Sequence, residues 1–165
     1  MANKPSPQSA TATSEGWMLL AHPVFVAKLE DFIAILERTK AKYPDTWQQK
    51  AIARFLKSLT HKILVEVPAS DDFSEYRHGG KLGKSSRKSS YRNWYRAKPG
   101  SRNRLFFRVD IQMKVIVYVW INDLDHPRKE GDKNDPYLVF AKLLDSGTVP
   151  NDFADLLSSS GDLPV

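Results

Sequence analysis

The fold is decided by residues 94–121, WYRAKPGSRNRLFFRVDIQMKVIVYVWI, in which apolar and polar side chains alternate over three short runs. A period of two residues, together with many Val, Ile, Phe, Tyr and Trp side chains, is typical of β-strands. We therefore expect strands at residues 94–98, 104–110 and 114–121. A Pro-Gly turn at residues 99–100 joins the first two, and strands linked this closely form an antiparallel meander.

Amphipathic helices are expected on both sides of these strands. One helix begins after His22, since Pro23 is tolerated in a first turn, and its apolar stripe continues to about Lys42. A second helix is expected to have Asp45 as its N-cap and to end before Pro68.

A third helix is expected after Asp135, which can cap it, with Pro136 in the first helical position. The order of elements predicts an α+β fold: an N-terminal αα-hairpin packed on a small antiparallel meander sheet, with a C-terminal helix. Residues 16–157 are expected to form a single domain. Residues 1–15 are expected to be a disordered tail, and residues 158–165 a flexible one.

Alternation along the second strand divides its side chains between two faces. Leu105 and Phe107 point toward one face, which suits the helical hairpin, while Arg104, Phe106 and Arg108 point toward the other. We expect the second face to be an open, concave, cationic surface. Two cations of the first strand would join it if the register of the strands matches.

Positive charge is concentrated in one segment. Residues 77–108 carry eleven Lys or Arg side chains and no Asp or Glu, so this segment has a net charge of +11 and the rest of the chain −5. Aromatic side chains lie among the cations. Cations suit phosphates and exposed rings suit unpaired bases, which predicts binding to RNA or to single strands. The alternative is a solvated basic loop with no ligand.

Composition excludes several kinds of site. The chain has no cysteine, and its four histidines lie 17 or more residues apart, so we expect no metal and no cofactor. Four aspartates could hold Mg²⁺, although turns and helix caps explain them at least as well; these are Asp123, Asp125, Asp132 and Asp135.

No apolar run approaches the ~20 residues needed to cross a bilayer, and the N-terminus lacks the apolar core of a signal peptide. We expect a cytoplasmic protein without a membrane partner.

Cleavage of RNA without a metal requires a base for the 2′-hydroxyl, cations for the charged phosphorane and an acid for the leaving oxygen. The candidates for the base are Lys98, whose pKa should be lowered by surrounding cations, and His78, which is equally well a structural loop residue. Arginine stabilises charge but transfers protons poorly, because its pKa stays above ~12. The other catalytic candidates are Arg96, Arg104 and Arg108.

A second group of cations is expected to bind RNA through its phosphates. Several of them lie in residues 77–92, a segment rich in Gly, Ser and Lys that is typical of a mobile loop. The group consists of Lys81, Lys84, Arg87, Lys88, Arg92, Arg102 and Arg128.

Several motifs resemble the YhaV toxin family. They are GWMLLAHPVF at 16–25, RHGGKLG at 77–83, RNRLFFR at 102–108 and KVIVYVWIND at 114–123. The resemblance continues to about residue 155 with matching order and spacing. YhaV toxins are the ribonuclease halves of PrlF–YhaV toxin–antitoxin modules and belong to the RelE-like group of mRNA interferases.

The resemblance implies metal-independent, translation-associated cleavage of mRNA on the ribosome. It also implies a PrlF-like antitoxin partner, held in a hetero-oligomeric complex that binds promoter DNA through the antitoxin. Carried over to this chain, the cationic positions of the family are His78, Lys81, Arg96, Lys98, Arg104, Arg108 and Arg128.

One position departs from the family pattern. Relatives carry a tyrosine two residues after the position that matches Arg128, whereas this chain has Glu130. An acid beside scissile RNA is repulsive, so this position is not catalytic or the enzyme is weak. Tyr137 matches the family, but its place on a helical stripe suits a core residue equally well.

Two other functions remain alternatives. A non-catalytic RNA- or ribosome-binding protein would need only the basic sheet. A toxin of the same fold that acts on a protein target would not need so dense a cationic face.

Overall fold

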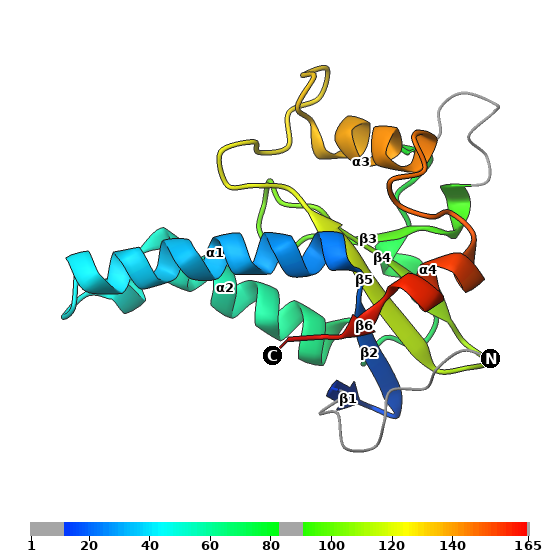
Figure 1. Ribbon diagram of the computed structural model, residues 1–165, viewed down its shortest axis with the longest axis horizontal. Coiled ribbons are helices and arrows are strands. Elements are labelled where there is room, and N and C mark those ends of the chain that lie inside the picture. Colours follow the sequence, from blue (N-terminus) through cyan, green and yellow to red (C-terminus); the bar gives the residue numbers. More distant parts are fainter. Residues whose placement is uncertain (1–11, 83–90, 165) are drawn as a thin grey trace.

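The structure, a computed structural model, describes residues 12–82 and 91–164 and has an α+β architecture (Figure 1). A six-stranded mixed sheet has the order β1-β2-β5-β4-β3, with β6 also paired to β2. Its strands are β1 (Ala12–Ser14), β2 (Trp17–Ala21), β3 (Tyr95–Ala97), β4 (Leu105–Asp110), β5 (Val115–Ile121) and β6 (Gly161–Asp162). The α-helices are α1 (Pro23–Lys42), α2 (Ala51–His61), α3 (Pro136–Asp145) and α4 (Phe153–Ser159). Short helical turns lie at Trp47–Gln49, Lys62–Glu66 and Ser74–Tyr76.

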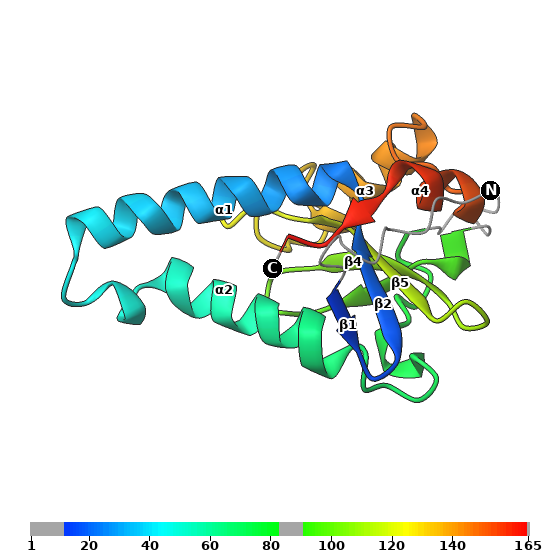
Figure 2. The same ribbon diagram turned by 60° about the horizontal axis from the view of Figure 1, so that its bottom comes forward.

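Helix α1 has the bounds that the sequence predicts. His22 caps it, its ring Nδ1 accepting the N–H of Val24 at 3.2 Å, and Pro23 lies in the first turn. Helices α1 and α2 run side by side as a hairpin whose far end projects beyond the sheet (Figure 2). Although α1 has 20 residues, neither it nor any other helix in the described part of the chain could span a membrane.

The predicted start of α2 is wrong. Asp45 does not cap it; a short turn at Trp47–Gln49 comes first, and α2 begins after Lys50, whose carbonyl accepts the N–H of Arg54. The capping pattern gave a start several residues too early because the chain needs a longer connection to reverse direction between two antiparallel helices.

The predicted meander is confirmed, but it is only part of the sheet. Strands β3, β4 and β5 pair antiparallel in sequence order. Strand β2 then lies parallel to β5, with Leu19 opposite Ile116, so the sheet is mixed and not purely antiparallel. The five residues of β2 are too few to show a period, and their partner strand lies about a hundred residues further along the chain.

Both faces of the sheet are covered, so the expected open face is wrong. Leu105 and Phe107 pack toward α1 and α2, as predicted. Phe106 points the other way, but it is fully buried under α3, where its ring stacks on Phe140 with centroids 4.4 Å apart. Arg104 and Arg108, on the same face, are each only 8% exposed. Alternation predicted correctly which face of the sheet each side chain points to. It could not predict that α3 covers one of these faces.

Two strands lie in segments that we expected to be tails. Strand β1 lies in the expected N-terminal tail and pairs with β2. Residues 1–11 of that tail lie outside the described part of the chain. At the other end, α4 continues to Ser159 and β6 pairs with β2. Leu163 is 2% exposed and belongs to the core between the sheet and the helical hairpin.

Candidate active site

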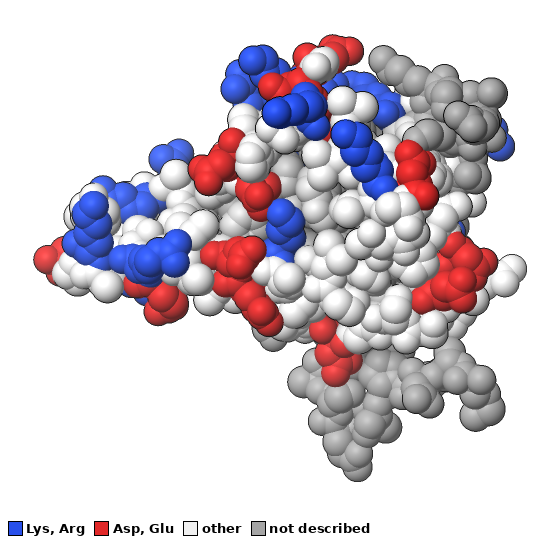
Figure 3. All heavy atoms as spheres, turned by 45° about the horizontal axis from the view of Figure 1, so that its top comes forward, with Lys and Arg blue, Asp and Glu red and all other residues white. Residues whose placement is uncertain are grey.

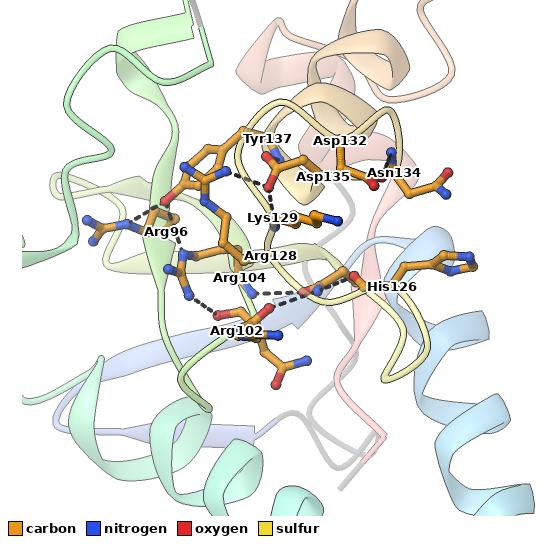
Figure 4. Close-up of polar contacts among 12 residues, drawn as sticks. Arg96, Arg102, Arg104, His126, Arg128, Lys129, Asp132, Asn134, Asp135 and Tyr137 are labelled. Atoms are coloured by element: carbon orange, nitrogen blue, oxygen red, sulfur yellow. Dashed lines mark hydrogen bonds and ion pairs between the residues drawn. The ribbon is translucent and has the colours of Figure 1, made fainter.

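Five cations from four parts of the chain lie near the side chain of Tyr137, and Figure 4 shows three of them, Arg96, Arg104 and Arg128. We call this group the Tyr137 cluster. Its cations come from β3 and the turn after it, from the residue before β4, from the loop between β5 and α3, and from the loop that precedes residue 83. They are Lys81, Arg96, Lys98, Arg104 and Arg128.

The hydroxyl of Tyr137 connects two of the arginines. It accepts one hydrogen bond from Nε of Arg96, at 3.0 Å, and another from Nε of Arg104, at 3.2 Å. Arg96 lies opposite Phe106 in the sheet, which places it on the same face as Arg104, so the register that the sequence left open does match. Because Tyr137 is only 3% exposed, its hydroxyl holds both guanidiniums in fixed positions.

Asp135 places Tyr137 and Arg128 relative to each other. One carboxylate oxygen accepts the backbone N–H of Tyr137 at 3.2 Å, as the cap of α3. The other accepts from Nη1 of Arg128 at 2.5 Å and from the backbone N–H of Lys129 at 2.8 Å. The Arg128 guanidinium therefore lies over the Tyr137 ring, 4.8 Å from its centroid. Lys81 also lies over this ring, at 5.6 Å.

Lys98 is an exposed lysine with an altered proton affinity. The positive charges of Arg96 and then Arg104 lower the pKa of Lys98 from its ordinary value, and its slight burial acts in the same direction. The neutral amine is therefore more populated than in an isolated lysine. This is the property that the sequence predicted for a base at this position.

Asn122 fixes the two loops that carry Arg104 and Arg128. Its side-chain oxygen accepts the backbone N–H of Arg104 at 2.8 Å, and its amide nitrogen donates to the carbonyl of Arg102 at 3.1 Å. That same carbonyl accepts the backbone N–H of Arg128 at 2.8 Å. The sequence analysis missed Asn122, although a polar residue directly after a continuous buried strand is a recognisable signal.

His78 is buried and serves its surrounding backbone. Its Nε2 donates to the carbonyl of Tyr91 at 2.9 Å, and its Nδ1 accepts the N–H of Leu82 at 3.4 Å. Burial lowers the pKa of His78, which favours this neutral form. Both ring nitrogens are thus engaged in joining residue 91 to the loop that carries Lys81.

Arg108 lies apart from the Tyr137 cluster. Its Nη1 donates to the carbonyl of Asn151 at 2.6 Å, and its guanidinium lies 5.2 Å from the Trp94 ring centroid and 5.5 Å from that of Phe153. Burial lowers the pKa of Arg108. The contacts join β4 to the segment before α4, so they suit a role in stability.

We expect Arg108→Ala to lower the free energy of unfolding by about 2 kcal/mol, the scale of a hydrogen bond to a charged group. RNA cleavage per folded molecule should stay within a few-fold of the unsubstituted protein. Denaturant unfolding and single-turnover cleavage would measure the two effects. Arg92→Ala, which removes an exposed cation, is the control for stability. Loss of cleavage with unchanged stability would return Arg108 to the active site.

Of the remaining predicted RNA-binding cations, the structure describes two. Arg92 and Arg102 are exposed, whereas Lys84, Arg87 and Lys88 lie outside the described residues. On the face shown in Figure 3, Lys and Arg gather near the loop before α3 and at the far end of the α1–α2 hairpin, with Asp and Glu between them. Positive charge on this face is therefore densest in these two regions, while other Lys and Arg side chains on it lie beside acids.

Three of the four aspartates have structural partners. Asp123 pairs with Lys28 at 2.6 Å, Asp132 accepts the backbone N–H of Asn134 in a turn, and Asp135 caps α3. Within residues 12–82 and 91–164, no group of His, Asp and Glu is arranged to hold a metal ion.

A cavity of about 300 Å³ opens beside the Tyr137 cluster. Its walls come from the cluster itself, from the loop that follows Arg128 and from the first turns of α3. The lining residues are Lys81, Arg128, Glu130, Gly131, Asp135, Tyr137 and Leu138.

The chain matches one family of known proteins. A family model described as a toxin with endonuclease activity, of a toxin–antitoxin system (Toxin_YhaV), matches residues 19–161. "Ribonuclease toxin YhaV" of Escherichia coli K12 is 38% identical over 143 residues, which cover 86% of this chain and 90% of the relative. "Toxin YhaV" of Escherichia coli O6:H1 matches with the same identity and coverage. No solved structure matches the chain.

Proposed function

Because the chain belongs to the YhaV family of toxins with endonuclease activity from toxin–antitoxin systems, we propose that it cleaves mRNA by attack of a 2′-hydroxyl, without a metal. The observation that carries this proposal is the Tyr137 cluster. It places Lys98, whose pKa is lowered, beside Arg96 and Arg104, two guanidiniums held by one hydroxyl.

Lys98 is the general base in this proposal. Its neutral amine takes the proton from a 2′-hydroxyl, and the oxygen then attacks the adjacent phosphorus. A lowered pKa leaves more of the amine neutral near physiological pH. His78 is a poorer candidate, because both of its ring nitrogens are already bonded to the backbone.

Arg96 and Arg104 stabilise the negative charge that develops on the phosphorane. Arg104 uses Nε for Tyr137 and Nη1 for the carbonyls of Ser101 and Asn103. No bond among the described residues engages Nη2, which leaves that nitrogen for a phosphate oxygen. Fixed donors act without reorganisation as charge develops, and removing one such donor typically costs about 10²–10³ in rate.

The bond from phosphorus to the 5′-oxygen breaks as the 2′-oxygen bond forms. The products are a 2′,3′-cyclic phosphate and a 5′-hydroxyl, and the departing oxygen takes up one proton. The ammonium group of Lys81, over the Tyr137 ring, is our candidate for the donor. Arg128, Arg92 and Arg102 bind phosphates along the strand.

Cleavage of a defined RNA by the purified protein, in the presence of EDTA, tests this function. We expect a 2′,3′-cyclic phosphate on the upstream fragment and a 5′-hydroxyl on the downstream one. A 2′-deoxy substitution at the cleaved nucleotide should abolish the cut. Cleavage that survives this substitution, or that requires added metal, would refute the mechanism. An RNA that binds and stays intact, both alone and on ribosomes, would favour the non-catalytic RNA-binding alternative.

We further propose that the antitoxin of this toxin is PrlF-like and covers the Tyr137 cluster with acidic and apolar residues. An uncovered cluster of five cations would act on RNA throughout the cell, so neutralisation is most direct where the charge is. Complementary charge would also make association fast and dependent on salt. In this proposal the mRNA is cut during translation, and the complex binds promoter DNA through the antitoxin.

A further inference from the structure

The cavity beside the Tyr137 cluster has the size and position of a binding site. Its volume of about 300 Å³ lies at the lower end of the range for small-ligand pockets. Tyr137, Arg128 and Lys81 belong both to its walls and to the cluster. A nucleotide next to the cleaved phosphate can therefore place its base in this cavity while its phosphate stays among the cations.

One of the two acidic residues that line the cavity has no partner among the described residues. Asp135 is fully engaged, because it accepts bonds from Arg128 and from two backbone N–H groups. Glu130 also lines the cavity and is exposed, and no ion pair or hydrogen bond within the described ranges involves it. Its two oxygens are free to accept hydrogen bonds from a ligand.

An acid at this place is unfavourable for RNA unless the RNA brings donors to it. A phosphate would be repelled, so the group that meets Glu130 is a base with N–H groups. Guanine presents two adjacent donors, N1–H and N2–H, which match the two oxygens of a carboxylate. Adenine and cytosine place an acceptor beside their amino donor, and uracil places its single N–H between two acceptors. Only guanine fits both oxygens.

The other walls suit the faces of a base. The guanidinium plane of Arg128 can stack on a base, as arginine does in single-stranded RNA recognition. Leu138, which is 45% exposed in the first turn of α3, offers an apolar contact. Positive φ at Gly131 (84°) lets the chain turn directly after Glu130, and both residues line the cavity.

We propose that this cavity binds a guanine base next to the cleaved phosphate and that the Glu130 carboxylate recognises its N1–H and N2–H groups. The proposal rests on the proposed function, since it places the guanine relative to the phosphate held by the Tyr137 cluster. It gives Glu130 a role in choosing where the RNA is cut.

Oligonucleotides with 2′-O-methyl groups at every position except one test the proposal, because a single 2′-hydroxyl fixes the cut. The base on each side of that position is varied among guanine, adenine, cytosine and uracil. We expect a preference for guanine of about tenfold or more at one of the two positions, the scale of a bidentate base contact. In Glu130→Ala and Glu130→Gln, the rate with guanine should fall to that with the other bases.

Asp132→Asn is the matched control. It removes an acidic side chain from the loop that carries Glu130, but Asp132 does not line the cavity. It should keep the guanine preference. Equal rates with all four bases, a preference for another base, or a guanine preference that both Glu130 variants retain would overturn the proposal.

Binding separates this proposal from the proposed function. Fully 2′-O-methylated oligonucleotides cannot be cleaved, and the unsubstituted protein should bind the guanine version about tenfold more tightly than the adenine version. If no RNA is cut but this preference exists and disappears in Glu130→Ala, the nuclease mechanism fails and the guanine site stands. If the guanine and adenine versions bind equally and RNA is cleaved normally, the guanine site fails and the nuclease mechanism stands.

Discussion

Replacing Lys98 with arginine should lower the rate of RNA cleavage by about 10²–10⁴-fold, the usual contribution of a general base. The substitution keeps the positive charge and removes only the group that can lose its proton near neutral pH. Affinity for RNA should therefore change little. Single-turnover cleavage and equilibrium binding to a non-cleavable RNA would measure the two quantities.

The dependence of the rate on pH gives the decisive signature of Lys98. The base acts in its neutral form, so the rate should rise with pH and level off above the pKa of Lys98. Since Arg96 and Arg104 lower this pKa, the plateau should begin at a lower pH than an ordinary lysine would allow. The rise should be absent in Lys98→Arg.

Lys57→Arg, on the exposed side of α2, is the matched control and should keep both the rate and its pH dependence. A Lys98→Arg protein that retains the alkaline rise would show that another group is the base.

Tyr137→Phe should lower the cleavage rate about a hundredfold while the protein stays folded. The phenylalanine ring keeps the edge-to-face contact with Phe106, whose centroid lies 5.6 Å away. What is lost is the acceptor shared by Arg96 and Arg104, so both guanidiniums lose their fixed positions. Misplaced stabilising groups reduce the rate of the chemical step more than they reduce binding. The cleavage rate at saturating RNA should therefore fall much more than the affinity.

Tyr118→Phe is the control for the loss of a buried tyrosine hydroxyl. Tyr118 is fully buried between the sheet and the helical hairpin, and its hydroxyl donates to the carbonyl of Ile63 at 2.8 Å. Its loss should cost about 1–3 kcal/mol of stability, because the carbonyl is left without a partner. Cleavage by the folded fraction should be unchanged. Equal effects of the two substitutions on the cleavage rate would mean that Tyr137 acts only through the fold.

Local patterns predicted the elements of this fold better than their arrangement. The start of a helix at Pro23, the cap at Asp135 and the strand periods at β4 and β5 depend on neighbouring residues, and the structure confirms them. The parallel pairing of β2 with β5 depends on residues far apart in the chain, and the covering of Phe106 by α3 depends on where a helix packs. Neither the β2–β5 pairing nor the covering of Phe106 produces a pattern among neighbouring residues that could predict it.

The same difference applies to the candidate site. Alternation and charge identified Arg96, Lys98 and Arg104, which the structure brings together around one side chain. The same signal included Arg108, because charge and alternation cannot show which ring or carbonyl a buried guanidinium contacts. Tyr137 was ambiguous for a physical reason: it is both a core residue and an acceptor for the two arginines.

The position of β2 has a consequence for the time at which this enzyme becomes active during its synthesis. Residues 17–21 leave the ribosome first, yet they pair with β5, about a hundred residues later, and with β6 at the end of the chain. At about 5–20 residues per second, this strand waits roughly 5–20 s for β5. Arg128 and Tyr137 follow β5 in the chain, and Leu163 enters the core last. A nascent chain that ends before Tyr137 therefore lacks both a complete sheet and the hydroxyl that holds Arg96 and Arg104. The proposed active site is therefore incomplete until late in the synthesis of the chain.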